Sequence, residues 1–167
     1  MRKKKVIKKR AVKLDKKFGS PLVTRLKNKI MWDGEARKAS KIVYQSAEII
    51  EKETGQSFLS ILETAIENAR PAYEVRSRKI GGANYRVPQI LTNERGIGWV
   101  FAKTVAAARE IKSSQSFHQK LAKIIIETFN KTGEVMKKKE ILNKEAASNM
   151  SFAASLNRNK GKQTPTN

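Results

Sequence analysis

The sequence contains no cysteine, and its only histidine is His118. The absence of cysteine excludes disulfides and thiolate metal sites, and a single histidine excludes a histidine-rich metal centre. No motif surrounds His118, which we interpret as a polar residue near the start of a helix. No apolar run approaches the length of a membrane span, and residues 1–17 lack the apolar stretch of a secretory signal. We therefore expect a chain without a metal, a cofactor or a membrane span.

Acidic residues are also scarce. The 167 residues include 15 aspartates and glutamates against 36 lysines and arginines, a formal net charge of +21. A compact protein with this charge repels itself unless a polyanion supplies the counter-charge. The two candidates are nucleic acid and an anionic membrane surface. The length is sufficient for one domain with a modest core.

The positive charge is concentrated at the N-terminus. Residues 1–17 hold ten basic residues and a single acid, Asp15. An arm with so few apolar side chains cannot form a core, so we predict that residues 1–17 are disordered when free. A dense group of positive charges gains most binding free energy from a chain of phosphates, because binding displaces the condensed counterions. This favours a nucleic-acid contact over a purely solubilising tail. The arm residues expected to make that contact are Arg2, Lys3, Lys4, Lys5, Lys8, Lys9, Arg10 and Lys13.

Helical periodicity dominates the rest of the chain. Start and stop signals mark the ends: serine N-caps, a proline at the first helical position, and glycines after the last turns. In the last helix we expect Leu142, Ala146, Met150 and Ala153 to face inward and Lys137 to Lys139 to face outward. The expected helices run from Pro21 to Ile30, from about Glu35 to Thr54, from Ser57 to Arg70, through Ile97 to Ile111, through Phe117 to Phe129, and from about Val135 to Ala154.

Residues 72–89 break this pattern and predict a β-hairpin between the third and fourth helices. Apolar and polar residues alternate on both sides of Gly81-Gly82, a pair typical of a two-residue turn. The fold class is therefore mainly α, with about six helices in one domain and a protruding hairpin. We expect one hairpin face to pack on the helices with Tyr73, Val75, Tyr85 and Val87. The other would carry Arg76, Arg78 and Arg86, and Lys79 adds to the charge of the hairpin.

The sequence shows no constellation of catalytic residues, and we expect no enzyme. Asp33 and Glu35 stand at a helix junction, where we interpret them as helix-end residues. Gly81-Gly82 lacks the Lys-Ser/Thr of a phosphate-binding loop, and Gly96 and Gly98 form an isolated G-x-G.

The two tryptophans are a separate question, because a tryptophan can stack on a nucleobase. Helical spacing nevertheless favours places for Trp32 and Trp99 in the core or at its edge.

What remains is a basic arm, a basic hairpin and a basic turn of the last helix. If the fold brings them to one face, they form a continuous surface for a folded RNA. Arginine suits the hairpin because its planar guanidinium binds phosphate through two bonds and can stack on a base. RNA is preferred to DNA because no helix shows a recognition pattern for a major groove.

Specific motifs carry a resemblance to a known family. They are FGS at 18–20, MWDG at 31–34, IVY at 42–44, ENARP at 67–71, the hairpin EVRSRKIGGANYRVP at 74–88, AAAR at 106–109, KKKE at 137–140, and Ala146, Asn149, Phe152 and Ala153. From Arg2 to about Ala154, the chain resembles universal small-subunit ribosomal protein seven of the bacterial or organellar lineage.

The resemblance implies a helical domain over 18–156, followed by a polar tail over 157–167. It implies binding to the 3′ major domain of small-subunit rRNA, nucleation of head assembly, and a place near the exit-site tRNA and the mRNA path. Neighbouring head and platform ribosomal proteins are the implied protein partners, and no homo-oligomer is expected. The implied RNA contacts fall on the arm and on Arg37, Lys38, Arg76, Arg78, Lys79, Arg86, Lys137, Lys138 and Lys139, with Gly81 and Gly82 forming the hairpin turn.

The chain also departs from the family pattern. Glu35-Ala36 stand where the family has lysines, and Arg37 and Lys38 follow one step later. The stretch 93–103 lacks the usual arginine pair and carries Trp99. The aromatic C-terminal ending is replaced by 155–157 and a polar tail. This drift favours a mitochondrial ribosome over one in the bacterial cytoplasm or the plastid stroma.

A basic protein of the membrane surface is the alternative interpretation. The arm offers anionic lipid a dense positive charge. Its large apolar residues are too few for insertion: Val6, Ile7, Val12 and Leu14. A third interpretation is a nucleic-acid enzyme. Such an enzyme would need clustered acidic residues to bind metal ions, and the sequence shows none.

Overall fold

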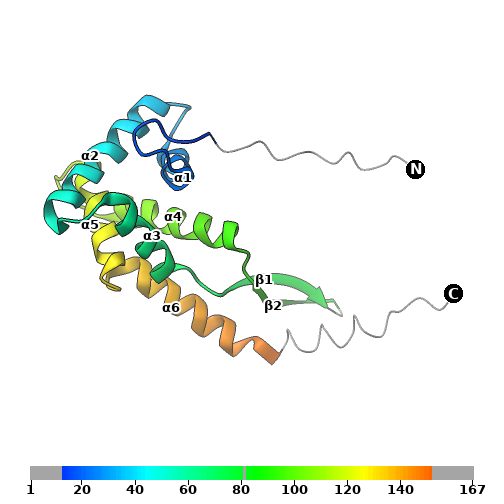
Figure 1. The fold of residues 1–167 in the computed structure, drawn as a ribbon. Coiled ribbons are helices and arrows are strands. Elements are labelled where there is room, and N and C mark those ends of the chain that lie inside the picture. The colour runs from blue at the N-terminus through cyan, green and yellow to red at the C-terminus, as the bar shows by residue number, and fades with distance from the viewer. Residues whose placement is uncertain (1–12, 81, 152–167) are drawn as a thin grey trace, which may run out of the picture.

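The computed structural model describes residues 13–80 and 82–151. In this part of the chain, six helices and one antiparallel hairpin confirm the predicted fold class. Figure 1 shows the hairpin inserted between α3 and α4. The elements are α1 (Pro21–Ile30), α2 (Ala36–Thr54), α3 (Phe58–Ala69), β1 (Tyr73–Ile80), β2 (Ala83–Ile90), α4 (Asn93–Glu110), α5 (Phe117–Phe129) and α6 (Gly133–Ser148).

Local signals set several helix ends. The Ser20 hydroxyl accepts a hydrogen bond from the Leu22 amide at 3.2 Å, with Pro21 at the first helical position of α1. Helix α2 ends at Gly55, whose φ of 69° is left-handed and suits glycine. Helix α3 gives way to extended backbone at Arg70, the residue before a proline.

Helix α5 is the centre of the core. It packs against α2, α3, α4 and α6, while α1 lies on α2 and α4. Its inward side chains include Leu121 and Ile125, which are buried together with Leu26, Ile50 and Phe58 of the surrounding helices. The hydrophobic effect of this one cluster therefore holds all six described helices.

The last helix differs in part from the prediction. Ala146 is buried and Leu142 is half-buried, but Met150, which we expected to face inward, is 40% exposed. Met150 comes after α6, which ends at Ser148. In addition, the last turns of α6 lie along the hairpin and not in the helical core (Figure 1). Ala153, the predicted helix end at Ala154 and the tail over 157–167 lie outside the described residues.

The predicted division of the hairpin faces is wrong. Ile80 pairs with Ala83 across the two-residue turn, and Val75 pairs with Pro88. Directly paired residues share a face, so odd-numbered residues of β1 lie with even-numbered residues of β2. One face carries Tyr73, Val75, Ser77, Lys79, Asn84, Arg86, Pro88 and Ile90; the other carries Glu74, Arg76, Arg78, Tyr85, Val87 and Gln89. Tyr73 and Val75 therefore lie on the face opposite Tyr85 and Val87, and Arg86 lies on the face opposite Arg76 and Arg78.

The arrangement separates two candidate surfaces. In Figure 1 the hairpin projects to the right, beyond the ends of α3 and α4 and alongside α6. Helices α1 and α2 lie at the upper left, on the other side of α4. The cations of the hairpin and those of α1 and α2 are thus presented by different parts of the domain.

Candidate nucleic-acid interface

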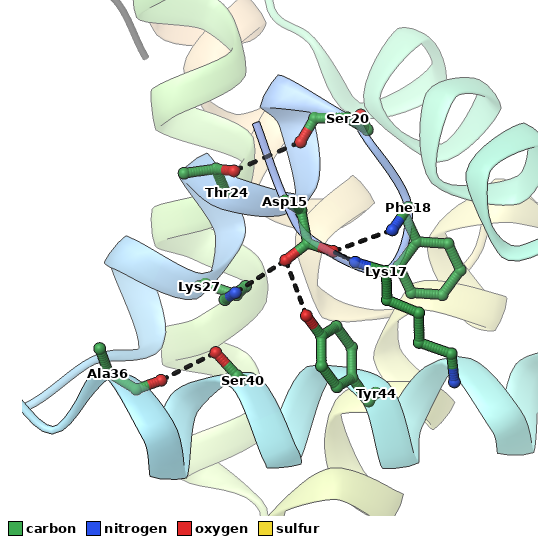
Figure 2. A network of polar contacts seen from close by, with 9 residues as sticks. All are labelled: Asp15, Lys17, Phe18, Ser20, Thr24, Lys27, Ala36, Ser40 and Tyr44. Atoms are coloured by element: carbon green, nitrogen blue, oxygen red, sulfur yellow. Dashed lines mark hydrogen bonds and ion pairs between the residues drawn. The ribbon is translucent and has the colours of Figure 1, made fainter. Parts of the chain in front are cut away.

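A buried carboxylate fixes the segment that precedes α1. The Asp15 side chain is fully buried and accepts four hydrogen bonds (Figure 2). Lys27 Nζ and the Tyr44 hydroxyl donate to Oδ1 at 2.7 Å and 2.9 Å. The backbone amides of Lys17 and Phe18 donate to Oδ2, each at 3.0 Å. One side chain therefore joins the end of the basic arm to α1 and α2.

The same contacts keep Asp15 ionised. Burial alone would raise the pKa of this carboxyl group, because it removes water from the charged form. The hydrogen bonds from Lys27, Phe18, Tyr44 and Lys17 outweigh burial and lower the pKa to about 2. Reciprocally, the hydrogen bond to Asp15 raises the pKa of Lys27 against the opposing effect of its burial.

An open groove of about 910 Å³ lies beside this anchor, between the segment 13–16, α1 and α2. We call it the α1–α2 groove. Five of its lining side chains are cationic and one, Glu48, is acidic, and Glu48 is paired with Lys17 at 3.3 Å. Such a groove attracts a polyanion because it concentrates charge of one sign. The lining residues are Lys13, Leu14, Lys16, Thr24, Lys27, Asn28, Ala36, Arg37, Ser40, Lys41, Tyr44, Gln45 and Glu48.

The groove unites predicted and unpredicted residues. Lys13 and Arg37 were expected to contact RNA, and the structure places both in its wall. Lys38 lies outside the wall and is paired with Glu35 at 2.7 Å. Lys27 and Lys41 are additions that the sequence analysis missed, since each has other cations near it on its helix and no motif distinguishes it from them. The one sequence feature that could have pointed to this groove is Asp15, the single acidic residue in the basic segment 1–17.

A smaller cleft of about 320 Å³ continues from the groove between α1 and α4. We call it the α1–α4 cleft. Asn28 lines both, so the two hollows adjoin. Arg25 and Lys29 add positive charge, while Glu94 lies 4.0 Å from Arg25. The cleft thus extends the polar surface from the groove toward the start of α4.

Salt bridges tie the hairpin to two helices, one on each face. On one face, Glu74 binds Arg76 of its own strand and Arg95 of α4, the latter at 2.8 Å. On the other, Arg86 binds Glu145 of α6. Arg78 and Lys79, nearer the turn, are exposed. The cations closest to the tip are therefore those best placed for a large ligand.

The three lysines of α6 do not all face outward as expected. Lys137 is exposed, but Lys138 and Lys139 are half-buried. Lys138 donates to Glu110 at 2.9 Å, and this bond raises its pKa. Lys139 donates to the Asn68 carbonyl in the last turn of α3, and burial lowers its pKa. A lysine at this position complements the negative end of a helix, which gives Lys139 a structural partner within the protein.

The tryptophans differ from each other. Trp32, which we expected in or at the edge of the core, is 66% exposed and therefore contradicts the prediction. The reason is that Trp32 follows the end of α1 at Ile30, so the helical spacing no longer applies. Trp99 is partly buried against the core, with Lys103 Nζ 5.8 Å from its ring centroid.

Several predicted residues lie outside the described part of the chain. They are Gly81 and the arm residues Arg2, Lys3, Lys4, Lys5, Lys8, Lys9 and Arg10. Gly82 is described, and its φ of 92° is the left-handed conformation that a glycine supplies in a tight turn.

Among residues 13–80 and 82–151, no three histidine, aspartate or glutamate side chains are grouped so that they could hold a metal ion. No described helix combines the length and apolar character that crossing a bilayer requires.

Similar proteins come from several bacteria. The chain is 40% identical over 144 residues to small ribosomal subunit protein uS7 of Fervidobacterium nodosum, covering 86% of this chain and 92% of that protein. It is 40% identical over 145 residues to the protein of the same name from Thermotoga maritima, covering 87% and 93%. The protein of the same name from Lactobacillus helveticus is 39% identical over 149 residues, covering 87% and 92%. All three relatives are bacterial, which gives the predicted preference for a mitochondrial ribosome no support.

The family model gives the same assignment over nearly the whole chain. The model described as ribosomal protein S7p/S5e matches residues 1–150, which include the hairpin and both adjoining hollows. Together with identities near 40% over most of the chain, this match shows that the protein belongs to the ribosomal protein S7p/S5e family.

Proposed function

We propose that this protein is a structural component of the small ribosomal subunit that binds rRNA and carries out no catalytic step. Family membership supports the ribosomal role. The finer proposal is binding to the 3′ major domain of the rRNA, where the protein would nucleate assembly of the head. Because the relatives are bacterial, we place this role in the bacterial cytoplasm.

The observation that carries the RNA-binding proposal is the charge of the α1–α2 groove. Lys27 is compensated by Asp15, the only buried acid among the described residues, so Lys13, Lys16, Arg37 and Lys41 have no such acid beside them there. Lys13 and Lys16 lie on the segment that the Asp15 anchor holds, and Arg37 and Lys41 lie on helix α2, so little of the backbone has to be fixed on binding. Phosphates in the groove would release condensed counterions, which is the main source of affinity for nucleic acid.

The hairpin has a second part in the proposal. Its exposed tip, with Arg78 and Lys79, projects beyond the helices and can reach ligands that the body does not touch (Figure 1). We propose that the hairpin lies near the exit-site tRNA and the path of the mRNA. Neighbouring head and platform proteins would cover parts of the surface that RNA leaves free.

The experiment compares two charge-matched double variants. The probe is a transcript of the 3′ major domain of a bacterial small-subunit rRNA. Arg37→Ala with Lys41→Ala removes two cations from the groove; Lys52→Ala with Lys123→Ala removes two exposed cations from outside it. Each lost phosphate contact lowers the slope of log affinity against log salt by about 0.7 to 0.9. We therefore expect the groove variant to lose about 1.5 units of slope and the matched control to lose much less.

Two results would overturn the proposal. Equal losses in the two double variants would mean that RNA responds only to total charge. Flotation with anionic vesicles, combined with weak binding to the transcript, would instead favour the membrane-surface interpretation.

A further inference from the structure

Trp32 is an exposed aromatic residue that the electrostatic proposal does not use. Its side chain belongs to the turn between α1 and α2, and the residue is 66% exposed. Large exposed aromatic rings are costly to leave in water, so a function for the ring has to be considered. The turn stands beside the α1–α2 groove, whose wall includes Ala36 and Arg37.

The turn has a defined backbone. Asp33 and Gly34 both have positive φ, 48° and 78°, and the Glu35 amide donates to the Trp32 carbonyl at 2.9 Å. These are the features of a tight turn with two left-handed central residues. The backbone on which the indole stands is thus closed by a hydrogen bond of its own.

One face of the indole ring already has a partner. The Arg109 guanidinium carbon lies 5.0 Å from the ring centroid, a cation–π distance. Arg109 is itself held at the end of α1, where it donates to the Ile30 carbonyl at 3.3 Å. Arg109 lies over the ring and the residue is still 66% exposed, so much of the indole remains open to solvent in the described part of the chain.

The charges around the ring favour an uncharged planar ligand next to phosphates. Lys29 and Arg37 are exposed and can attract the RNA backbone on either side of the turn. Asp33, directly beside the tryptophan, is also exposed and would repel a phosphate placed on the ring. A nucleobase carries no charge and presents a flat face, so it fits where a phosphate does not.

We propose that Trp32, backed by Arg109, is a stacking site for one unpaired nucleobase of the RNA bound in the α1–α2 groove. The proposal rests on the RNA-binding function above and adds the class of nucleotide that this end of the groove accepts. A base in a duplex is already stacked on both sides, so the site selects a nucleotide in a loop, a bulge or an end.

The first experiment follows tryptophan fluorescence during titration with the 3′ major-domain transcript. The chain has two tryptophans, so the difference between the unchanged protein and Trp32→Phe isolates the emission of Trp32. We expect the transcript to quench that emission and to protect it from acrylamide. The Trp99→Phe variant is the matched control, because Trp99 is partly buried and its loss should leave the quenching unchanged.

The second experiment measures affinity. Stacking on one aromatic side chain is worth about 1 to 3 kcal/mol per base, which corresponds to about 5- to 150-fold in affinity. We expect Trp32→Leu to lose about tenfold or more and Trp32→Phe to lose less, because phenylalanine keeps an aromatic face. The ring is exposed, so neither change should prevent folding, and a denaturation curve checks this directly.

The outcomes separate this proposal from the broader one. If the groove double variant loses affinity while Trp32→Leu binds normally and the bound ring stays open to acrylamide, the stacking site is wrong and the RNA-binding groove stands. Protection from acrylamide by a protein partner but not by the transcript would also overturn the stacking site. If every variant binds RNA as tightly as the unchanged protein, both the stacking site and the RNA-binding groove are wrong.

Discussion

The α1–α2 groove and the hairpin both carry cations, but they hold them differently. Beside the groove, Asp15 is the one buried acid among the described residues, and it fixes the backbone that supports Lys13 and Lys16. In the hairpin, the acids Glu74 and Glu145 bind cations of the strands directly. An acid that anchors the scaffold leaves the surrounding charge available, whereas an acid that pairs at the surface cancels part of it.

The comparison suggests a division of labour. The groove is concave, close to the core and preorganised, which suits tight binding of an RNA backbone. The hairpin is thin and carries its exposed Arg78 and Lys79 away from the body, which suits contact with ligands that the helices do not touch. Four predictions test this contrast, from the largest expected effect to the smallest.

The largest effect should come from removing the anchor. Asp15→Ala leaves Lys27 and Tyr44 without their shared acceptor, and breaking a buried, hydrogen-bonded charge pair costs about 3 kcal/mol or more. We expect a loss of about 3 kcal/mol in the free energy of unfolding, measured by urea denaturation. Glu48→Gln is the control, because the Lys17–Glu48 pair is exposed and worth about 0.5 kcal/mol or less. Similar losses in both variants would remove the distinction between anchoring and surface acids.

The second prediction concerns pH. The pKa of Asp15 is lowered from 3.8 to about 2 on folding, so its ionised form stabilises the folded state above pH 3.8. That contribution, about 2 kcal/mol at 1.36 kcal/mol per pKa unit, should be lost as the pH falls from about 4 through about 2. Thermal unfolding across this window measures it. The Asp15→Asn variant should lack this part of the pH dependence, and an unchanged profile would show that other carboxylates are responsible.

The third prediction separates the hairpin faces. Arg78→Ala and Arg86→Ala remove the same charge from opposite faces of one ribbon. We expect Arg78→Ala to weaken binding to the 3′ major-domain transcript about fivefold, as for the loss of one charged contact. Arg86→Ala should have an effect of less than about twofold, because Glu145 already pairs with Arg86. Filter binding at fixed salt measures both. Equal losses would indicate that RNA contacts both faces.

The smallest effect is expected at Lys139. Its ammonium group donates to the Asn68 carbonyl at the end of α3, but burial opposes its charge. Lys139→Met keeps an unbranched side chain as far as Cε and loses the ammonium group with its hydrogen bond, so we expect a destabilisation of about 0.5 to 1 kcal/mol by urea denaturation. Lys137→Met, at an exposed site on the same helix, should be neutral. A large loss of RNA affinity in Lys139→Met, with stability unchanged, would reassign this lysine from the scaffold to the interface.

Local chemistry made much of the fold predictable. Serine caps, Pro21, Gly55 and the Arg70–Pro71 step act within a few residues of the helix ends that they set, and the structure bears them out. The hairpin was also predictable, but the division of its faces was not. Alternation within each strand does not fix how the strands pair, and the two-residue turn joins odd positions of β1 to even positions of β2.

The candidate site was less accessible to sequence reasoning. The Asp15 anchor joins residues 12 and 29 positions apart, and only the packing of α1 on α2 brings them together. Lys41 has no local mark that distinguishes it from any exposed lysine. The helical spacing that favours a core position for Trp32 ends with α1 at Ile30, and Trp32 lies exposed in the turn that follows.

The pairing of Ile80 with Ala83 limits how the length of this hairpin can change in evolution. Gain or loss of one residue between them would rotate every side chain of the second strand through to the reverse side. Arg86 would then join Arg76, and Val87 would leave its buried position. Lineages of this hairpin should therefore tolerate length changes in pairs far more readily than single insertions or deletions.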